Sequence, residues 1–235
     1  MDYICSFFLY LFTKKEYKNI DLYQSSHMII TYDKQIKKFH IRTQIQENAD
    51  ILMKSISNCI LKNTTNNSTT DIILDPDYMG ISFYANTVVI EPNNNQNNEP
   101  TTNPLSYNNA IYMLFYLGQQ QNYLETQGYG FYQLSNTMKD IIVINNCIYL
   151  YTNQSHIKKL DKSGQFYFDY PFDKSICSPE LMKICTLPAT ISHTTFYYSL
   201  GTIISQLLGP TQRIINTKLY WCIKRCLDDR ILLFI

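Results

Sequence analysis

The chain has 235 residues, with 20 Lys and Arg, 19 Asp and Glu, and a formal net charge of +1. This length suits one domain of ordinary size or two small lobes, and it is long enough to bury a hydrophobic core. The balanced charge excludes a general polyanion-binding protein, because no basic excess exists to release counterions from nucleic acid. We therefore expect no nucleic-acid partner. The odd number of cysteines, seven at irregular spacings, argues against a disulfide framework.

The first apolar run covers residues 4–12 and is too short to span a bilayer. Asp2 precedes it, and Lys14 and Lys15 follow it, so it lacks the positive region that begins a secretory signal. We expect this run to pack on the domain as a helix or strand. A short membrane or partner anchor is the alternative interpretation, and no transmembrane span is predicted.

Residues 1–92 predict a small β-rich lobe with one helix. The expected elements are a hairpin over 27–45, a helix from about Asp50 to Lys62, and strands at 71–74 and 79–90. Residues 91–104 are rich in Asn and Pro, and we expect them to loop out without packing. The boundary between the lobes is placed in this stretch, with 93–104 as the linker.

Residues 105–235 predict a mainly helical lobe with one embedded hairpin, so the fold class is α+β. The expected elements are a helix over 105–126, a hairpin of 141–144 and 147–151 across Asn145-Asn146, a strand at 165–168, a helical turn at 178–181, and helices over 194–208 and about 217–227. In the first helix we expect one buried face, formed by Tyr107, Ile111, Leu114, Leu117 and Leu124.

Four short motifs of this second lobe resemble, in order and spacing, motifs of the C-lobe of protein kinases. They are Asp140-Ile141-Ile142-Val143-Ile144, Cys177-Ser178-Pro179-Glu180-Leu181, Tyr197-Tyr198-Ser199-Leu200-Gly201-Thr202-Ile203-Ile204 and Lys224-Arg225-Cys226-Leu227-Asp228-Asp229-Arg230. The second is similar to the Ala-Pro-Glu motif, and the third to the Asp-x-Trp-Ser-Leu-Gly start of the large central helix. The resemblance covers roughly residues 105–235. It implies a protein-kinase-like two-lobed fold with a reduced β-rich N-lobe and a trimmed C-lobe.

The resemblance places the catalytic positions of a kinase on residues that do not fit the chemistry. The catalytic Asp falls on Ser135, the metal-binding Asn on Asp140, and the metal-binding Asp on Asn153. A serine cannot accept the substrate proton at neutral pH, and an amide lacks the charge that attracts Mg²⁺. No Gly precedes Gly80, so the first lobe cannot form a glycine-rich loop over phosphates. Asp140 is left as a weak candidate for a metal ligand.

Lys37 and Lys38 are weak candidates for the phosphate-binding lysine of the first lobe. The helix predicted after them contains no Glu to pair with such a lysine, which favours a solvated surface position. The nearest acids beyond Asn153 are Asp161 and Asp169, and neither precedes Phe-Gly. We interpret His193 as a packing or capping residue at the start of the central helix.

Several residues that have structural roles in protein kinases are present in this sequence at the matching positions. The resemblance implies a buried ion pair between Glu180 and Arg230, and Ser199 and Gly201 match the central helix. Phe196 stands where the family has an Asp that braces the catalytic-loop backbone, which implies that the brace and the loop it holds are both lost.

The structural positions of the family are present and its catalytic positions are not, and this combination predicts a pseudokinase. Such a protein would be a regulatory or protein-interaction module with an unknown protein partner and no cofactor. One alternative is a divergent active Ser/Thr kinase that uses ATP and Mg²⁺. The other is a structural, virion-type protein that uses the fold as a spacer. The Asn-rich, AT-codon-biased composition resembles that of giant viruses of amoebae, so we expect a cytoplasmic location, in the host cytoplasm or virus factory if the chain is viral.

Overall fold

The computed structural model describes residues 19–24, 28–63, 71–90, 105–135, 138–171, 178–209 and 214–228. The apolar run 4–12, the predicted linker 93–104 and Arg230 lie outside these ranges. The described chain is mixed α+β, as expected, and its strand pairs are antiparallel. Within these ranges, no helix has the length and apolar character needed to cross a bilayer.

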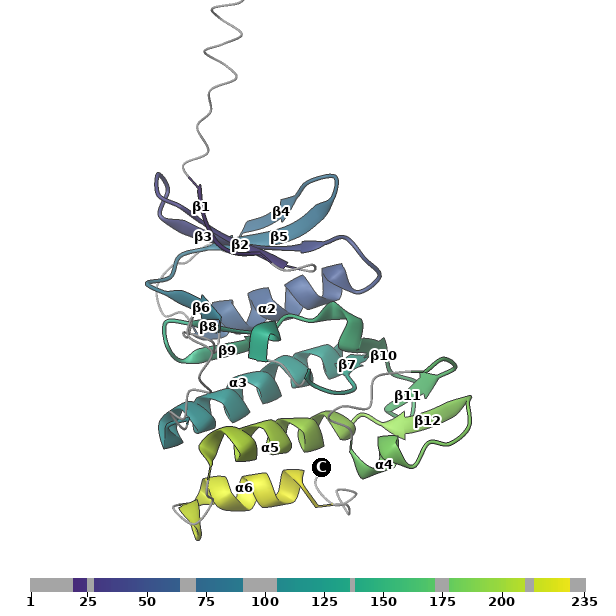
Figure 1. The fold of residues 1–235 in the computed structure, drawn as a ribbon. Helices are drawn as coiled ribbons and strands as arrows, with labels where there is room; N and C mark the ends of the chain where they lie inside the picture. The colour runs from purple at the N-terminus through teal and green to yellow at the C-terminus, as the bar shows by residue number, and fades with distance from the viewer. Residues whose placement is uncertain are drawn as a thin grey trace, which may run out of the picture.

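A five-stranded sheet forms the first layer of the molecule (Figure 1). Its strands, in spatial order, are β1 (Asn19–Gln24), β2 (Met28–Asp33), β3 (Lys38–Gln44), β5 (Tyr78–Phe83) and β4 (Asp71–Leu74). The alternation of apolar and polar residues puts Ile30, Ile41 and Ile81 side by side on one face, where each is at most 1% exposed. Helix α2 (Ala49–Asn63) packs on this face through residues that include Leu52 and Ile56.

The predicted hairpin and the helix after it are confirmed, and β4 has the predicted bounds. The single strand predicted over 79–90 is wrong. Residues 84–87 are not in a strand, and the strands on either side of them belong to different sheets. The second of these strands is β6 (Val88–Ile90), which pairs with β8 (Ile141–Ile144), and β8 pairs in turn with β9 (Ile148–Tyr151). Asn145 and Asn146 have φ values of 52° and 60°, the left-handed geometry of a tight hairpin turn, as predicted.

Three helices complete the layers below this sheet (Figure 1). They are α3 (Tyr107–Thr126), α5 (Thr195–Leu208) and α6 (Lys218–Cys226), all close to their predicted bounds. The predicted buried face of α3 is only partly right. Tyr107 and Ile111 are 39% and 38% exposed, whereas Gln120 and Gln121 are fully buried. These two glutamines turn inward because they bond to the backbone of neighbouring strands.

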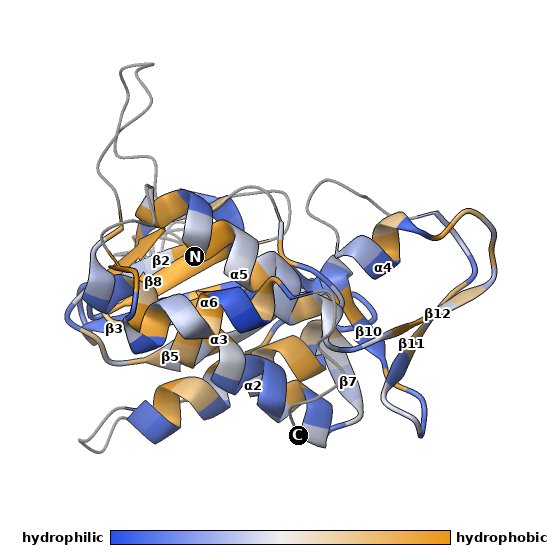
Figure 2. Cartoon of the chain, turned by 90° about the horizontal axis from the view of Figure 1, so that it is seen from below, coloured by the Kyte–Doolittle hydropathy of each residue, from blue (hydrophilic) through white to orange (hydrophobic). Residues whose placement is uncertain are grey.

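The remaining elements are short. They are β7 (Tyr129–Phe131), β10 (Ile157–Lys159), β11 (Gln165–Phe168), β12 (Ala189–Ser192), α4 (Pro179–Met182) and the 3₁₀ turns η1 (Met138–Asp140) and η2 (Gln154–His156). Strand β11 and the turn of α4 confirm the prediction, whereas β1, β7, β10 and β12 were not predicted. Figure 2 shows β11, β12 and α4 projecting to one side of the helices. They enclose a second small core, which contains Phe166, Phe168 and Leu181.

The main hydrophobic core is continuous from Met28 of β2 to Ile223 of α6. It joins the five-stranded sheet and α2 to the hairpin β8–β9 and to the three lower helices. The segments on the two sides of the predicted linker are therefore packed together through apolar side chains. This continuity fixes β8 and β9, and the loops that flank them, against both halves of the chain.

Candidate functional site

The segment after β7, which the resemblance equates with a catalytic loop, is tied to the start of α5. The backbone N–H of Leu134 donates to Oγ of Ser199 at 3.0 Å, and the hydroxyl of Thr195 donates to the carbonyl of Tyr132 at 2.8 Å. Both hydroxyl side chains are buried. Two hydroxyl groups of α5 therefore hold this segment, although the sequence implied that nothing in α5 would do so.

Phe196 fills the position of the missing carboxylate with apolar contact. Its side chain is fully buried, and its ring stacks on that of Phe131 with 5.9 Å between centroids. Apolar packing thus fixes the end of β7, and the hydrogen bonds of Thr195 and Ser199 fix the loop that follows. The loop is held more firmly than the sequence implied.

Replacing Ser199 by Ala should lower the free energy of unfolding by roughly 1–2 kcal/mol, because the buried N–H of Leu134 would lose its acceptor. The local result should be faster hydrogen exchange at the Leu134 amide than in the wild-type protein. Thr202→Ala is the matched control, since this half-buried hydroxyl donates only to the carbonyl of Tyr198 within the same helix. Equal exchange rates at Leu134 in all three proteins would contradict the brace.

Asp140 and Asn153, which the resemblance equates with two metal-binding positions, lie side by side. Nδ2 of Asn153 donates to Oδ2 of Asp140 at 3.0 Å, and the backbone N–H of Thr152 donates to the carbonyl of Asp140 at 2.8 Å. The resemblance leads one to expect an Asn and an Asp in the opposite order at these two positions. The described ranges contain no group of three or more His, Cys, Asp or Glu side chains that could hold a metal ion. The pair by itself offers a cation the carboxylate of Asp140, because Oδ1 of Asn153 already accepts hydrogen bonds from the N–H and hydroxyl of Ser155.

Ser135, which the resemblance equates with the catalytic base, takes part in the structure through its backbone. Its N–H donates to the hydroxyl oxygen of Tyr151 at 2.7 Å, and that hydroxyl also lies 2.6 Å from Nδ1 of His156. Burial raises the pKa of Tyr151 well above its ordinary value, so the phenol stays neutral. Serine has a neutral hydroxyl, whereas phosphoryl transfer by a kinase requires a carboxylate base at the equivalent position.

The two lysine candidates differ in position. Lys37 belongs to the turn before β3, with φ of 55° and an exposed side chain, so its predicted place in the strand is wrong. Lys38 is the first residue of β3, and its ammonium group pairs with the carboxylate of Asp71 at 2.6 Å. The hydrogen bond with Asp71 raises the pKa of Lys38. The predicted absence of a Glu partner in α2 is confirmed, and the acidic partner of Lys38 comes from β4 instead.

Other sequence candidates have structural roles. Oδ1 of Asp161 accepts hydrogen bonds from the N–H and hydroxyl of Ser163 and from the N–H of Gln165, which close the turn before β11. Glu180 lies in the first turn of α4, where Ser178 caps the helix. Its predicted partner Arg230 is outside the described residues, so the Glu180–Arg230 ion pair stays a prediction.

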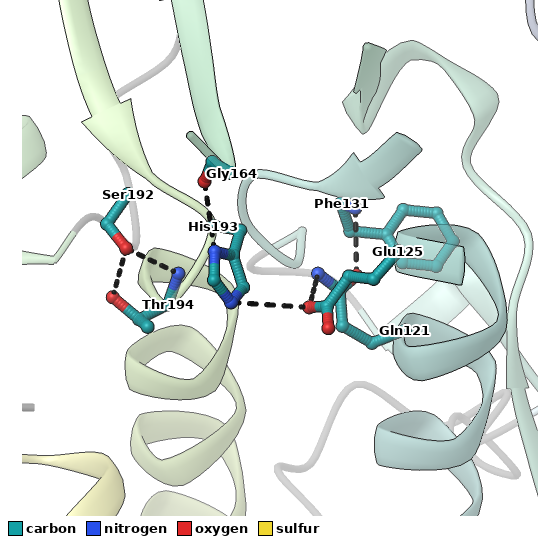
Figure 3. A network of polar contacts seen from close by, with 7 residues as sticks. All are labelled: Gln121, Glu125, Phe131, Gly164, Ser192, His193 and Thr194. Carbon is teal, nitrogen blue, oxygen red and sulfur yellow. Dashed lines mark hydrogen bonds and ion pairs between the residues drawn. The ribbon is translucent and has the colours of Figure 1, made fainter. Parts of the chain in front are cut away.

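His193 is a packing residue, as we interpreted it from the sequence. Figure 3 shows its imidazole between the carbonyl of Gly164 and the carboxylate of Glu125. Nδ1 lies 2.9 Å from the carbonyl oxygen of Gly164, which fixes Nδ1 as the protonated nitrogen because a carbonyl only accepts. Nε2 lies 4.0 Å from Oε1 of Glu125. The network joins α3 to the turn before β11 and to the start of α5.

Glu125→Gln should change how stability depends on pH. Burial raises the pKa of Glu125, and the hydrogen bond from Gln121 and the attraction of His193 oppose this shift only partly. A raised pKa in the folded state means that this carboxyl stabilises the fold below its ordinary pKa and loses that contribution as pH rises through the folded-state value. The difference in Tm, variant minus wild type, should therefore become more positive as pH rises from about 4 to about 8. A constant difference across this range would contradict the buried carboxylate.

No family model matches the chain, and no curated protein matches its sequence. The function has to be inferred from the arrangement of the residues themselves.

Proposed function

We propose that this chain is a catalytically impaired, protein-kinase-like domain that acts as a regulatory or protein-interaction module in the cytoplasm, with a protein as its partner. The observation that carries the proposal is the loop 132–135. Hydroxyl groups from the Ser-Leu-Gly helix α5 hold the loop backbone in place, and the resemblance equates Ser135 of this loop with the base of a kinase. The geometry of a catalytic loop is supported without the group that would do the chemistry.

The other parts that phosphoryl transfer requires are also altered. Lys38 bonds to Asp71 of the neighbouring strand, and α2 contains no Glu that could orient a lysine toward phosphates. In place of an ion pair, Ser55 of α2 accepts a hydrogen bond from Gln120 of α3. If α2 corresponds to the helix whose position controls kinase activity, that helix is attached here by apolar packing and a neutral hydrogen bond.

The order of the elements supports the kinase-like part of the proposal. The strands of an antiparallel sheet come first in the chain, with one helix between the third and fourth of them. Helices follow, with a hairpin inserted after the first helix of this second part. The hairpin β8–β9 carries Asp140 and Asn153 at its two outer ends, where the resemblance places the metal ligands of a kinase. Two lobes joined by the stretch 93–104 are part of this proposal.

A thermal-shift panel of ATP and GTP with Mg²⁺ or Mn²⁺ tests the proposal. We expect no nucleotide-dependent change in Tm at millimolar ligand. A ligand at 100 times its Kd would stabilise the protein by about 2.7 kcal/mol. For a chain of this size that corresponds to a rise in Tm of roughly 5–10 °C. A rise of this order that requires the metal ion would contradict the proposal.

One observation favours the alternative of a divergent active kinase. The amide nitrogen of Asn153 lies 3.0 Å from the carboxylate of Asp140, so the two residues that the resemblance equates with metal ligands are adjacent, with carboxylate and amide in exchanged order. Under this alternative, Asp140→Asn should abolish a metal-dependent nucleotide shift, and the exchange Asp140→Asn with Asn153→Asp should restore it. Under the pseudokinase proposal, the wild type and both variants lack the shift.

A further inference from the structure

The first three turns of α3 carry a row of large apolar side chains that the fold leaves exposed. Tyr107, Ile111 and Phe115 are 39%, 38% and 57% exposed, and Tyr112 beside them is 40% exposed. Residues four apart lie above one another on a helix, so Tyr107, Ile111 and Phe115 form one continuous ridge, the α3 ridge. Figure 1 shows these turns at one edge of the molecule. A contiguous apolar surface, unlike single exposed residues, indicates an interaction site.

A second row of side chains borders the α3 ridge and forms a groove with it. This row contains Asn108, Tyr112 and the half-buried Tyr116. The ring of Tyr116 lies edge-on to that of Phe115 with 5.1 Å between centroids, and 6.4 Å from that of Tyr112. These ring contacts hold both walls of the groove in place.

The exposed face of α3 is also free of charge. Residues 107–124 include no Asp, Glu, Lys or Arg, and the one charged residue of the helix, Glu125, is half-buried beside His193. By contrast, the exposed faces of the other surface helices are charged, as by Lys54 of α2 and Lys224 of α6. Aromatic residues are enriched and charged residues depleted in the cores of protein interfaces. The composition of this face is that of an interface core.

The order of the side chains makes the α3 ridge complementary to a second copy of itself. A two-fold axis brings the same patch of both copies together. With the axis at Ile111 the two helices run antiparallel, so each isoleucine lies beside its counterpart, and Tyr107 lies beside Phe115 of the other copy. Ridges of residues four apart fit into each other's grooves when the helices cross at about −50°. Because both faces are neutral and the net charge is only +1, no repulsion opposes the contact.

We propose that the chain forms a two-fold symmetric dimer through the exposed face of α3, with Ile111 at the axis. The exposed parts of the four side chains amount to roughly 300–400 Å² per copy. A standard interface buries about 800 Å² per partner, so this contact gives a weak dimer whose Kd lies in the micromolar range or above. The inference goes beyond the proposed function, and it uses none of the residues on which that function rests.

Sedimentation velocity of the full chain, from about 1 μM to about 1 mM, tests the proposal. The sedimentation coefficient should rise with concentration from the value of a monomer toward that of a dimer. Ile111→Glu and Ile111→Lys should each raise the Kd of the dimer at least tenfold, because two like charges would meet at the axis. An equimolar mixture of these two variants should dimerise again, because opposite charges would then meet.

Tyr167→Glu and Tyr167→Lys are the matched controls, since Tyr167 of β11 is a similarly exposed aromatic residue, and both should dimerise like the wild type. A monomer at every concentration would overturn the proposal, even if its α3 face bound an amphipathic helical peptide, because the face would then belong to another protein. Dimers that persist in both Ile111 variants, or that the mixture does not restore, would place the contact elsewhere. An equal loss in the Tyr167 variants would reduce the effect to general charge repulsion and would overturn it as well. None of these measurements involves nucleotide, so the dimer and the pseudokinase assignment can fail separately.

Discussion

Replacing Gln120 by Met should lower the free energy of unfolding by roughly 2–5 kcal/mol. Gln120 is fully buried in α3 and makes three hydrogen bonds. Its Nε2 donates to Oγ of Ser55 at 3.1 Å and to the carbonyl of Tyr151 at 2.9 Å, and its Oε1 accepts from the N–H of Tyr151 at 2.8 Å. Met has a similar volume but cannot bond, so both backbone groups of Tyr151 would be left without these partners.

The loss should appear as a decrease in Tm of about 10 °C for a chain of this length. Gln206→Met is the matched control, because the side chain of Gln206 is exposed on α5, and its effect should stay within about 0.5 kcal/mol. Similar decreases in the two variants would mean that the bonds of Gln120 to β9 contribute little. Tyr151 also holds the loop at Ser135, so the Gln120 variant should in addition show faster exchange at the Ser135 amide.

The elements that could be predicted are those whose signals are local. The turn Asn145-Asn146 between two apolar runs indicates a hairpin because asparagine tolerates positive φ, and both residues adopt it. Gly209 ends α5 with φ of 68°, as a glycine after an apolar periodic run predicts. In each case the sequence that decides the structure lies within a few residues of it.

The parts that could not be predicted depend on partners far along the chain. Gln120 and Gln121 are buried because they bond to the backbone at Tyr151 and Phe131, and a run of glutamines in a helix has no periodic signal for that. Ile111 has the apolar character of a core residue and is nevertheless 38% exposed. The short strands β7 and β10 exist through their pairing with each other, across about 25 residues of chain.

The candidate site shows the same division. The hairpin that carries Asp140 and Asn153 was predicted from its local turn, whereas the contact between the two residues was not, because it depends on how the two strands pair. The contacts between α5 and the loop were missed because only the position of Phe196 was considered, whereas the hydroxyls of the neighbouring Thr195 and of Ser199 hold the loop.

Gly201→Ala should destabilise the packing of α6 on α5. A Cβ added at Gly201 would lie 2.6 Å from Cβ of Cys226 and 3.5 Å from the side chain of Leu227, so α6 would have to move away. Cβ of Cys226 is fixed to the backbone of α6, and no rotamer change can relieve the contact. Overpacking of this kind costs about 1–3 kcal/mol, against a gain of up to about 1 kcal/mol from the higher helix propensity of Ala.

Gly118→Ala separates these two contributions. Gly118 lies inside α3, and a Cβ added there meets no atom within 4 Å, so this variant should show the gain in helix propensity without the clash. The Tm of Gly118→Ala should rise by roughly 2–4 °C, and that of Gly201→Ala should fall by a similar amount or more. Because both substitutions replace glycine by alanine within a helix, the difference between the two Tm values measures the close approach of α5 and α6. A rise in both variants would show that α6 does not approach α5 at Gly201 as closely as the structure has it, and would remove this glycine from the positions that the kinase resemblance explains.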